Sequence, residues 1–242
     1  MEEEQEEKMT GKEKLKAALN HEEAPVLFDL GGLNTTGMHC IVMEKLREFY
    51  GLEKKPVTII EPSQMLGHMD ADLADCLGVE TELVWGSRNC YGFKGEDQYK
   101  EWRTPWGQVV LVPEEFRTTV DAKGDTLIYA CGDLDYSAAG RMPRGGVYFD
   151  NEDRAPAYDE DNYDINDNLE EFQVFAEGEI DWLKKQVGQL RDASHVITCF
   201  GPGTTGGGTC LADHSMIAGP MLREPKGIRR LEDFYMATAA DP

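Results

Sequence analysis

The sequence predicts an α/β fold of the (β/α)8 TIM-barrel type that is incomplete, with about four βα units and an antiparallel β insertion. Short apolar runs alternate with amphipathic helical patterns between residues 10 and 90, which is typical of a parallel sheet. Residues 98–150 instead contain strand-like runs separated by turn residues. A complete barrel takes ~250 residues without large insertions. Residues 10–242 are therefore predicted to form one partial barrel that carries this insertion.

Composition narrows the classes of partner. The chain carries 24 basic and 46 acidic residues, a net charge of −22, which repels the phosphates of nucleic acids and of anionic membranes. No apolar run approaches the ~20 residues of a membrane span. Residues 1–9 predict a disordered acidic tail rather than a signal peptide. The six cysteines form no Cys-x-x-Cys pair and are expected to be reduced thiols in a cytoplasmic protein.

The first elements are predicted from their end signals. Thr10 and Glu13 form a capping box for a short helix that ends near Asn20. An apolar strand follows at Val26–Asp29. A helix is then predicted from about residue 36 to residue 50, because its apolar residues recur at three- and four-residue spacing.

Two further strands and a short helix follow. Residues 56–60 predict a second strand and Val79–Trp85 predicts a third. Between them, Asp70 or Asp72 caps a short helix that ends at Gly78. The order of these elements predicts three neighbouring parallel strands.

The part of the chain after the insertion returns to helical and strand patterns. An acidic linker is predicted at residues 150–167, and the longest helix at about residues 168–191. A fourth parallel strand, His195–Phe200, leads into a glycine-rich loop at residues 201–209, and a last helical stretch covers residues 225–240.

Two carboxylates are the predicted catalytic residues. Asp29 ends the first predicted strand and Glu61 follows the second. Active sites of barrels lie at the carboxyl ends of the strands, where a carboxylate orients a substrate or acts as a base. The alternative for Asp29 is that it caps the helix that follows.

Three soft side chains are candidates for substrate binding. His39 and Cys40 lie at the start of a predicted helix, a position that lowers the pKa of a thiol. The alternative is that one of them faces the core and the other the loop. His68 lies in a polar loop after the second strand, where it lines the barrel mouth or lies on the surface.

Arg141 and Arg144 are rare positive charges in the predicted insertion. They are also candidates for substrate binding, because guanidinium groups recognise anionic ligands such as a corrinoid or a thiol sulfonate. The alternative is that they pair with the acidic residues around them.

Cys199, Cys210 and His214 form the remaining cluster of soft ligands and are weak candidates for zinc. The alternative for Cys199 is a buried structural role.

Four segments, taken in order, resemble the N-terminal half of the uroporphyrinogen decarboxylase superfamily. They read TGKEKLKAALNHEEAPV, FDLGGLNTTGMHC, VTIIEPSQMLGHMDADLADCLGVET and GRMPRGGVYFD. The chain is most similar to the branch that transfers methyl groups between corrinoid (cobalamin) proteins and thiols. This resemblance implies a cytoplasmic, often dimeric (β/α)8 barrel with its active site in the mouth. In that branch zinc is usually bound by His and Cys residues of the C-terminal half.

The sequence departs from the decarboxylases at two places. Asp29-Leu-Gly-Gly stands where those enzymes carry an arginine-bearing stretch, and the third strand ends in Trp85-Gly-Ser without their aspartate. A porphyrinogen carries many carboxylates that need cations, so part of a corrinoid-dependent methyltransferase is the preferred prediction. Its metal would activate a thiol for attack on a cobalt-bound methyl group. The alternatives are a uroporphyrinogen decarboxylase-type lyase and a non-catalytic binding subunit.

Half a barrel leaves strand edges exposed. We therefore expect a homo-oligomer, or a second chain that supplies the missing half-barrel, and a corrinoid protein as a further partner that carries the methyl group.

Overall fold

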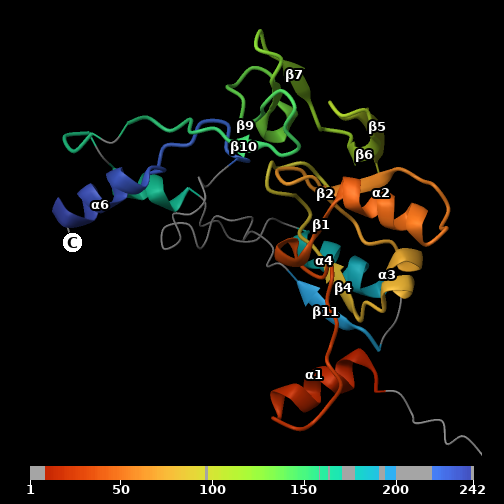
Figure 1. The fold of residues 1–242 in the computed structure, drawn as a ribbon. Coiled ribbons are helices and arrows are strands. Elements are labelled where there is room, and N and C mark those ends of the chain that lie inside the picture. The colour runs from red at the N-terminus through yellow and green to blue at the C-terminus, as the bar shows by residue number, and fades with distance from the viewer. Residues whose placement is uncertain are drawn as a thin grey trace, which may run out of the picture.

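The computed structural model describes residues 9–95, 98–157, 159–162, 164–170, 178–190, 194–199 and 220–240. In these residues the chain is a mixed α/β protein with five α-helices and three sheets, none of which closes (Figure 1). None of these helices is long and apolar enough to cross a membrane. The helices are α1 (Gly11–Leu19), α2 (Cys40–Phe49), α3 (Ala71–Leu77), α4 (Glu179–Gly188) and α6 (Leu231–Ala240), and 3-10 turns cover Asn34–Thr36, Ala130–Gly132 and Ile165–Leu169.

The end signals of α1 and α3 are confirmed. Glu13 N donates to Thr10 Oγ1 at 3.2 Å and Thr10 N donates to Glu13 Oε2 at 2.8 Å, which is the reciprocal pair of a capping box. Asp70 precedes α3, and Gly78 ends it with a φ of 71°. That left-handed conformation costs glycine little, because glycine has no Cβ.

The first sheet has the order β1-β3-β2-β6-β5, with β2 at its centre. β2 is antiparallel to β3 and parallel to β6, so Val57 lies opposite Val110. The β5–β6 hairpin of the predicted insertion therefore extends the same sheet as β2. The strands are β1 (Met38–His39), β3 (Leu66–Gly67), β2 (Val57–Glu61), β6 (Val109–Pro113) and β5 (Tyr99–Arg103).

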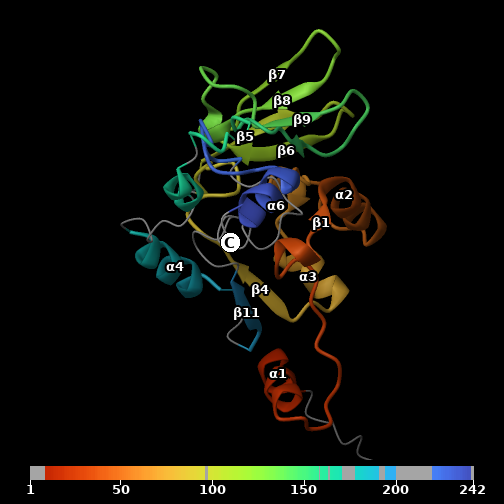
Figure 2. The same cartoon turned by 90° about the vertical axis from the view of Figure 1, so that its left-hand side faces the viewer.

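The second sheet is antiparallel throughout, and the third pairs two strands in parallel. In Figure 2 the second sheet lies at one end of the molecule, whereas the third sheet and α1 lie toward the other end. The second sheet contains β10 (Asp150–Asn151), β9 (Gly140–Met142), β8 (Thr126–Ile128) and β7 (Thr118–Val120), and the third contains β11 (Val196–Cys199) and β4 (Thr81–Val84).

Two predictions about the strands are wrong. Val26–Asp29 is extended but forms no strand, and Val26 is 84% exposed. The predicted parallel neighbours β2 and β4 lie in different sheets. The reason is that both edges of β2 are occupied by β3 and β6, so its edge hydrogen bonds are already made.

Three helix boundaries also differ from the prediction. α2 begins only at Cys40, because the two residues before it form β1. Of the long helix predicted at 168–191, the described part is a 3-10 turn that ends at Leu169 and the ten residues of α4. The last helix begins at Leu231 rather than near residue 225. The glycine-rich loop at 201–209 lies outside the described residues.

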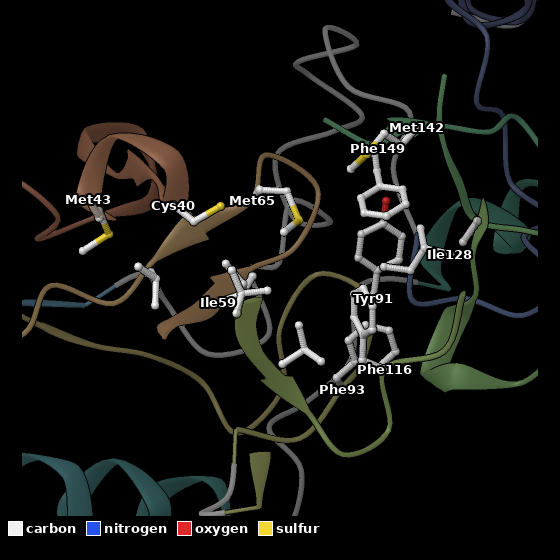
Figure 3. Close-up of a cluster of buried hydrophobic side chains, with 14 of the residues drawn as sticks. Cys40, Met43, Ile59, Met65, Tyr91, Phe93, Phe116, Ile128, Met142 and Phe149 are labelled. Carbon is white, nitrogen blue, oxygen red and sulfur yellow. The ribbon is translucent and has the colours of Figure 1, made fainter. Parts of the chain in front are cut away.

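One buried apolar cluster joins the first and second sheets (Figure 3). Phe93 is central to it, with its ring 5.9 Å from that of Tyr91 and 5.7 Å from that of Phe116. Buried aromatic residues of this kind contribute about 3–5 kcal/mol each when measured by truncation to alanine. The shared cluster therefore fixes the insertion against β2. Its labelled members are Cys40, Met43, Ile59, Met65, Tyr91, Phe93, Phe116, Ile128, Met142 and Phe149.

Candidate functional site

Asp29 connects the loop at residues 29–32 to β4 through hydrogen bonds. Its Oδ1 accepts hydrogen bonds from Gly32 N at 3.0 Å and from the Thr81 hydroxyl. A Cβ on Gly32 would overlap that carboxylate, so the loop requires glycine there. Asp29 thereby holds Leu30 and Gly31 against β4, which makes it a positioning residue for the cavity that these two residues line.

Glu61 is 4% exposed and its carboxylate is engaged by donors of the chain itself. It accepts hydrogen bonds from Ser63 N at 3.0 Å, from Gln64 N at 2.8 Å and from the Cys90 thiol at 3.0 Å, and from the Ser63 hydroxyl. Burial raises the pKa of the Cys90 thiol well above its usual range. The thiol therefore stays protonated and donates a hydrogen bond to Glu61. This arrangement stabilises the turn after β2.

His39 and Cys40 have structural contacts. His39 Nδ1 accepts from Ile41 N at 3.1 Å as the cap of α2, and its Nε2 lies 3.2 Å from Val147 O. Cys40 is fully buried. The expected lowering of its pKa is wrong, because burial raises the pKa of the Cys40 thiol to about 12.

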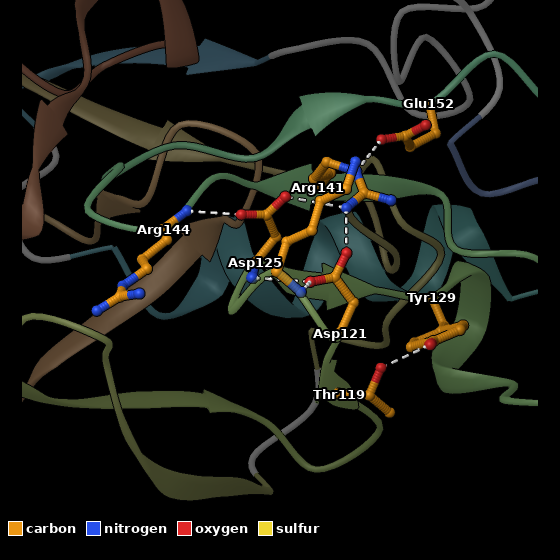
Figure 4. A network of polar contacts seen from close by, with 8 residues as sticks. Thr119, Asp121, Asp125, Tyr129, Arg141, Arg144 and Glu152 are labelled. Carbon is orange, nitrogen blue, oxygen red and sulfur yellow. Dashed lines mark hydrogen bonds and ion pairs between the residues drawn. The ribbon is translucent and has the colours of Figure 1, made fainter.

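Arg141 is the centre of an ionic cluster in the second sheet (Figure 4). Its guanidinium lies 2.6 Å from Asp121 Oδ2, 3.1 Å from Asp125 Oδ2 and 2.7 Å from Glu152 Oε1. These hydrogen bonds raise the pKa of Arg141 above its usual range. Arg144 donates its backbone N–H to Asp125 at 2.9 Å, whereas its guanidinium points away from the carboxylates (Figure 4). Pairing with nearby acids is therefore what the geometry shows for Arg141.

Only one of the three zinc candidates lies among the described residues. Cys199 ends β11, whereas Cys210 and His214 lie outside the described residues. Within the described part of the chain, no group of three His, Cys, Asp or Glu side chains could hold a metal ion.

His68 lies where two adjoining hollows meet, which we call together the His68 cavity. An apolar lobe of about 260 Å³ and an aromatic lobe of about 230 Å³ share the lining residues His68, Trp85, Gln186 and Gln189. The apolar lobe is further lined by Leu30, Met69, Ala71, Ala74, Leu83 and Leu190. The aromatic lobe is further lined by Thr58, Ile60, Gly95, Tyr99, Trp182 and Lys185.

Helix α4 covers this cavity and is tied to the segment after β4 at both of its ends. Glu179 accepts hydrogen bonds from Ser87 N at 2.9 Å and Ser87 Oγ at 2.5 Å. Near the other end, Gln186 Nε2 donates to Trp85 O at 2.5 Å, and Trp182 Nε1 donates to the same oxygen at 3.0 Å. These bonds fix the helix over β4 and close one side of the cavity.

Burial favours the neutral form of the His68 imidazole and so lowers its pKa. The charge of Asp70 opposes this with a smaller effect, followed by Lys55, which lowers the pKa, and Glu82, which raises it. The ring packs edge-on to Trp85 at 5.5 Å between centroids. No described residue makes a hydrogen bond to either ring nitrogen. A neutral imidazole of this kind presents one lone pair and one N–H, which suits proton transfer.

Of the predicted site residues that the structure describes, His68 alone belongs to the cavity lining. Trp85, Trp182, Gln186 and Gln189 are lining residues that the sequence did not single out. Trp182 and Gln186 lie four residues apart on α4, and Gln189, which caps the helix, follows three residues later; this spacing is the signal that could have found them.

No protein-family model, no curated protein and no solved structure matches this chain.

Proposed function

We propose that this chain is part of a corrinoid-dependent methyltransferase that methylates a small thiol bound in the apolar lobe of the His68 cavity. The observation that supports this proposal is the neutral His68 imidazole, which faces a cavity and has no hydrogen-bond partner among the described residues. The resemblance of the sequence to the methyltransferase branch supplies the reaction class, and the geometry supplies the base.

In this proposal His68 accepts the proton of the bound thiol. The thiolate is the reactive form of a thiol, and at pH 7 the unprotonated imidazole is available to accept the thiol proton, as a weaker base than a free histidine because its pKa is lowered. A methylated corrinoid supplies the methyl group to sulfur and keeps the electron pair of the broken bond. The proton remains on His68 until it is released to solvent, so the charges balance.

The size of the cavity separates the two substrates. Each lobe is smaller than the ~300–1,000 Å³ of sites that enclose a drug-sized ligand. A small thiol fits such a volume, whereas a corrin ring does not. The methyl carrier therefore approaches from outside, as a corrinoid protein would.

The same proposal extends to the fold and its setting. β4 and β11 pair in parallel with Val196 opposite Thr81, as neighbouring barrel strands do. We propose that a second copy or a second chain completes a barrel around this pair. A reducing cytoplasm fits the thiol chemistry, and Cys40, Cys76, Cys90 and Cys131 are free thiols.

The test follows methylcobalamin by its visible spectrum under anaerobic conditions, with the uncharged thiol 2-mercaptoethanol as the methyl acceptor. We expect the chain to accelerate loss of the methylated form, and His68→Asn to reduce the rate by ~100-fold or more, the usual contribution of a general base. His21→Asn is the matched control, because His21 is exposed and lies outside the cavity.

The pH dependence separates a base from a structural residue. At a pH above the thiol's own pKa, roughly 8.5 for a free thiol, the substrate ionises without help. The difference between His68→Asn and the unaltered chain should then narrow. A difference that stays constant with pH, or no acceleration by the unaltered chain, would contradict the proposal. Formation of coproporphyrinogen from uroporphyrinogen would favour a lyase instead.

A further inference from the structure

The aromatic lobe of the His68 cavity is lined mainly by aromatic side chains. Trp85, Tyr99 and Trp182 line it together with His68, in a volume of about 230 Å³. Gly95 makes room for the indoles, because a Cβ there would lie 2.9 Å from Trp85 Nε1 and 3.6 Å from Trp182 Cζ2. The absence of a side chain at residue 95 thus keeps the lobe open.

One of these rings already attracts a cation. The ammonium of Lys185 lies 5.5 Å from the centre of the Trp182 ring, within the ~6 Å range of a cation–π interaction. Lys185 is exposed and is one turn away from the ring along α4, so its flexible side chain can leave the ring when another cation arrives.

The net charge of the whole chain favours a positive ligand over a negative one, whereas Lys185 is the one charged side chain among the residues that line the lobe. The whole chain has a net charge of −22. Glu82 lines the adjoining apolar lobe, and His68 is held neutral by burial. A field of this sign raises the local concentration of cations and lowers that of anions.

We propose that the aromatic lobe binds a methylated ammonium group, such as the trimethylammonium end of choline. Ring faces of Trp and Tyr are the usual protein partners of such groups, because the charge is spread over methyl groups that are weakly hydrated. The ligand replaces the Lys185 ammonium on Trp182 and contacts Trp85 and Tyr99. This binding does not depend on the proposed thiol methylation, since it uses the other lobe.

Substitution of Lys185 distinguishes a cation site from an anion site, because it should change the affinity for a cation and for an anion in opposite directions. If the lobe binds a cation, Lys185→Met removes a competitor and tightens binding. If the lobe instead binds a planar aromatic anion, Lys185 is its counter-ion and Lys185→Met weakens binding. Lys184→Met is the matched control, because Lys184 neighbours it on α4 but pairs with Asp181 and does not line the lobe.

The experiment is isothermal titration of the full chain with choline, with its neutral isostere 3,3-dimethyl-1-butanol and with benzoate. We expect choline to bind at least about tenfold more tightly than the isostere. Lys185→Met should tighten choline binding several-fold, and Lys184→Met should leave it unchanged. Trp182→Leu should weaken it by about tenfold or more, whereas Trp182→Phe, which keeps a ring face, should retain most of the affinity.

Three outcomes overturn the proposal. The first is no heat of binding for choline at up to about 10 mM, which corresponds to an affinity too weak for a specific site. The second is equal binding of choline and its isostere, which would show that the charge contributes nothing. The third is benzoate binding that Lys185→Met weakens, which would assign the lobe to an anion. Circular dichroism of each variant confirms that it is folded.

Discussion

The Arg141 cluster and the His68 cavity show two fates of polar side chains in one chain. In the cluster, one guanidinium meets three carboxylates at 2.6 to 3.1 Å, so each carboxylate has a hydrogen-bond donor within the protein. In the cavity, the ring nitrogens of His68 have no described hydrogen-bond partner and face space that a ligand can fill. The sequence alone made Arg141 and His68 look alike, as polar residues in loops or turns.

This difference distinguishes a side chain that stabilises the fold from a side chain that is available to bind a ligand. A satisfied ion pair has little left to offer a ligand, because binding would first have to break existing hydrogen bonds. An unsatisfied buried group gains a partner when a ligand arrives. Changes in the cluster should therefore alter stability and spare binding, whereas changes in the cavity should do the reverse.

The largest expected effect is the closing of the cavity by Gly95→Ala. The added methyl group would lie 2.9 Å from Trp85 Nε1, so the indole must shift into the aromatic lobe. We expect choline binding to weaken by about tenfold or more and the free energy of unfolding to fall by ~1–3 kcal/mol, as for other overpacked sites. Gly188→Ala on α4 is the control, since a Cβ there meets no atom within 4 Å. Unchanged choline binding in Gly95→Ala would contradict the assignment of the lobe.

A smaller and opposite effect is expected from Arg141→Met. This change leaves three carboxylates without their counter-ion, so the melting temperature should fall by a few degrees. Choline binding and methylcobalamin turnover should stay within twofold of the unaltered chain, on the order of experimental error. Arg144→Met is the matched control, because the side chain of Arg144 does not bind the carboxylates. Loss of turnover in Arg141→Met, with stability intact, would return Arg141 to the candidate site.

The smallest effect is the pH dependence of stability that His68 introduces. Its folded pKa lies below the unfolded value of about 6.5, so below that pH the unfolded state binds a proton that the folded state does not. The free energy of unfolding should therefore fall as pH drops below 6.5, by at most ~1.4 kcal/mol per pH unit. Above 6.5 this contribution vanishes. In His68→Phe that part of the slope should disappear in urea titrations, and an unchanged slope would show that His68 is not held neutral.

Local features of the fold could be predicted from sequence because local residues determine them. The capping box at Thr10 and the helix end at Gly78 each depend on a few neighbouring residues. Strand partners depend on distant residues instead. The assignment of β6 rather than β4 as the parallel neighbour of β2 is such a choice, and no local pattern indicates it.

The site was predicted only in part for a related reason. His68 stood out by its chemistry, but its neighbours on α4 did not. Ile180 and Val187 are apolar residues of that helix, yet they are 48% and 45% exposed. Gln186 and Trp182 take the inner face because they donate hydrogen bonds to a backbone oxygen after β4. The periodicity of apolar residues contains no information about such side-chain hydrogen bonds.

The hydrogen bonds that hold α4 over the cavity have a consequence for how the ligand specificity of this protein can change. Trp182, Lys185 and Gln186 lie on the ten-residue helix α4, Gln189 caps its C-terminus, and all four line the aromatic lobe. The strands beneath supply the fixed wall, and Glu179 anchors the helix from outside the lining. Substitutions in this one short segment can thus change the ligand selectivity of the lobe without altering the buried apolar core. Engineering of new recognition in this scaffold would begin with a library at those four positions.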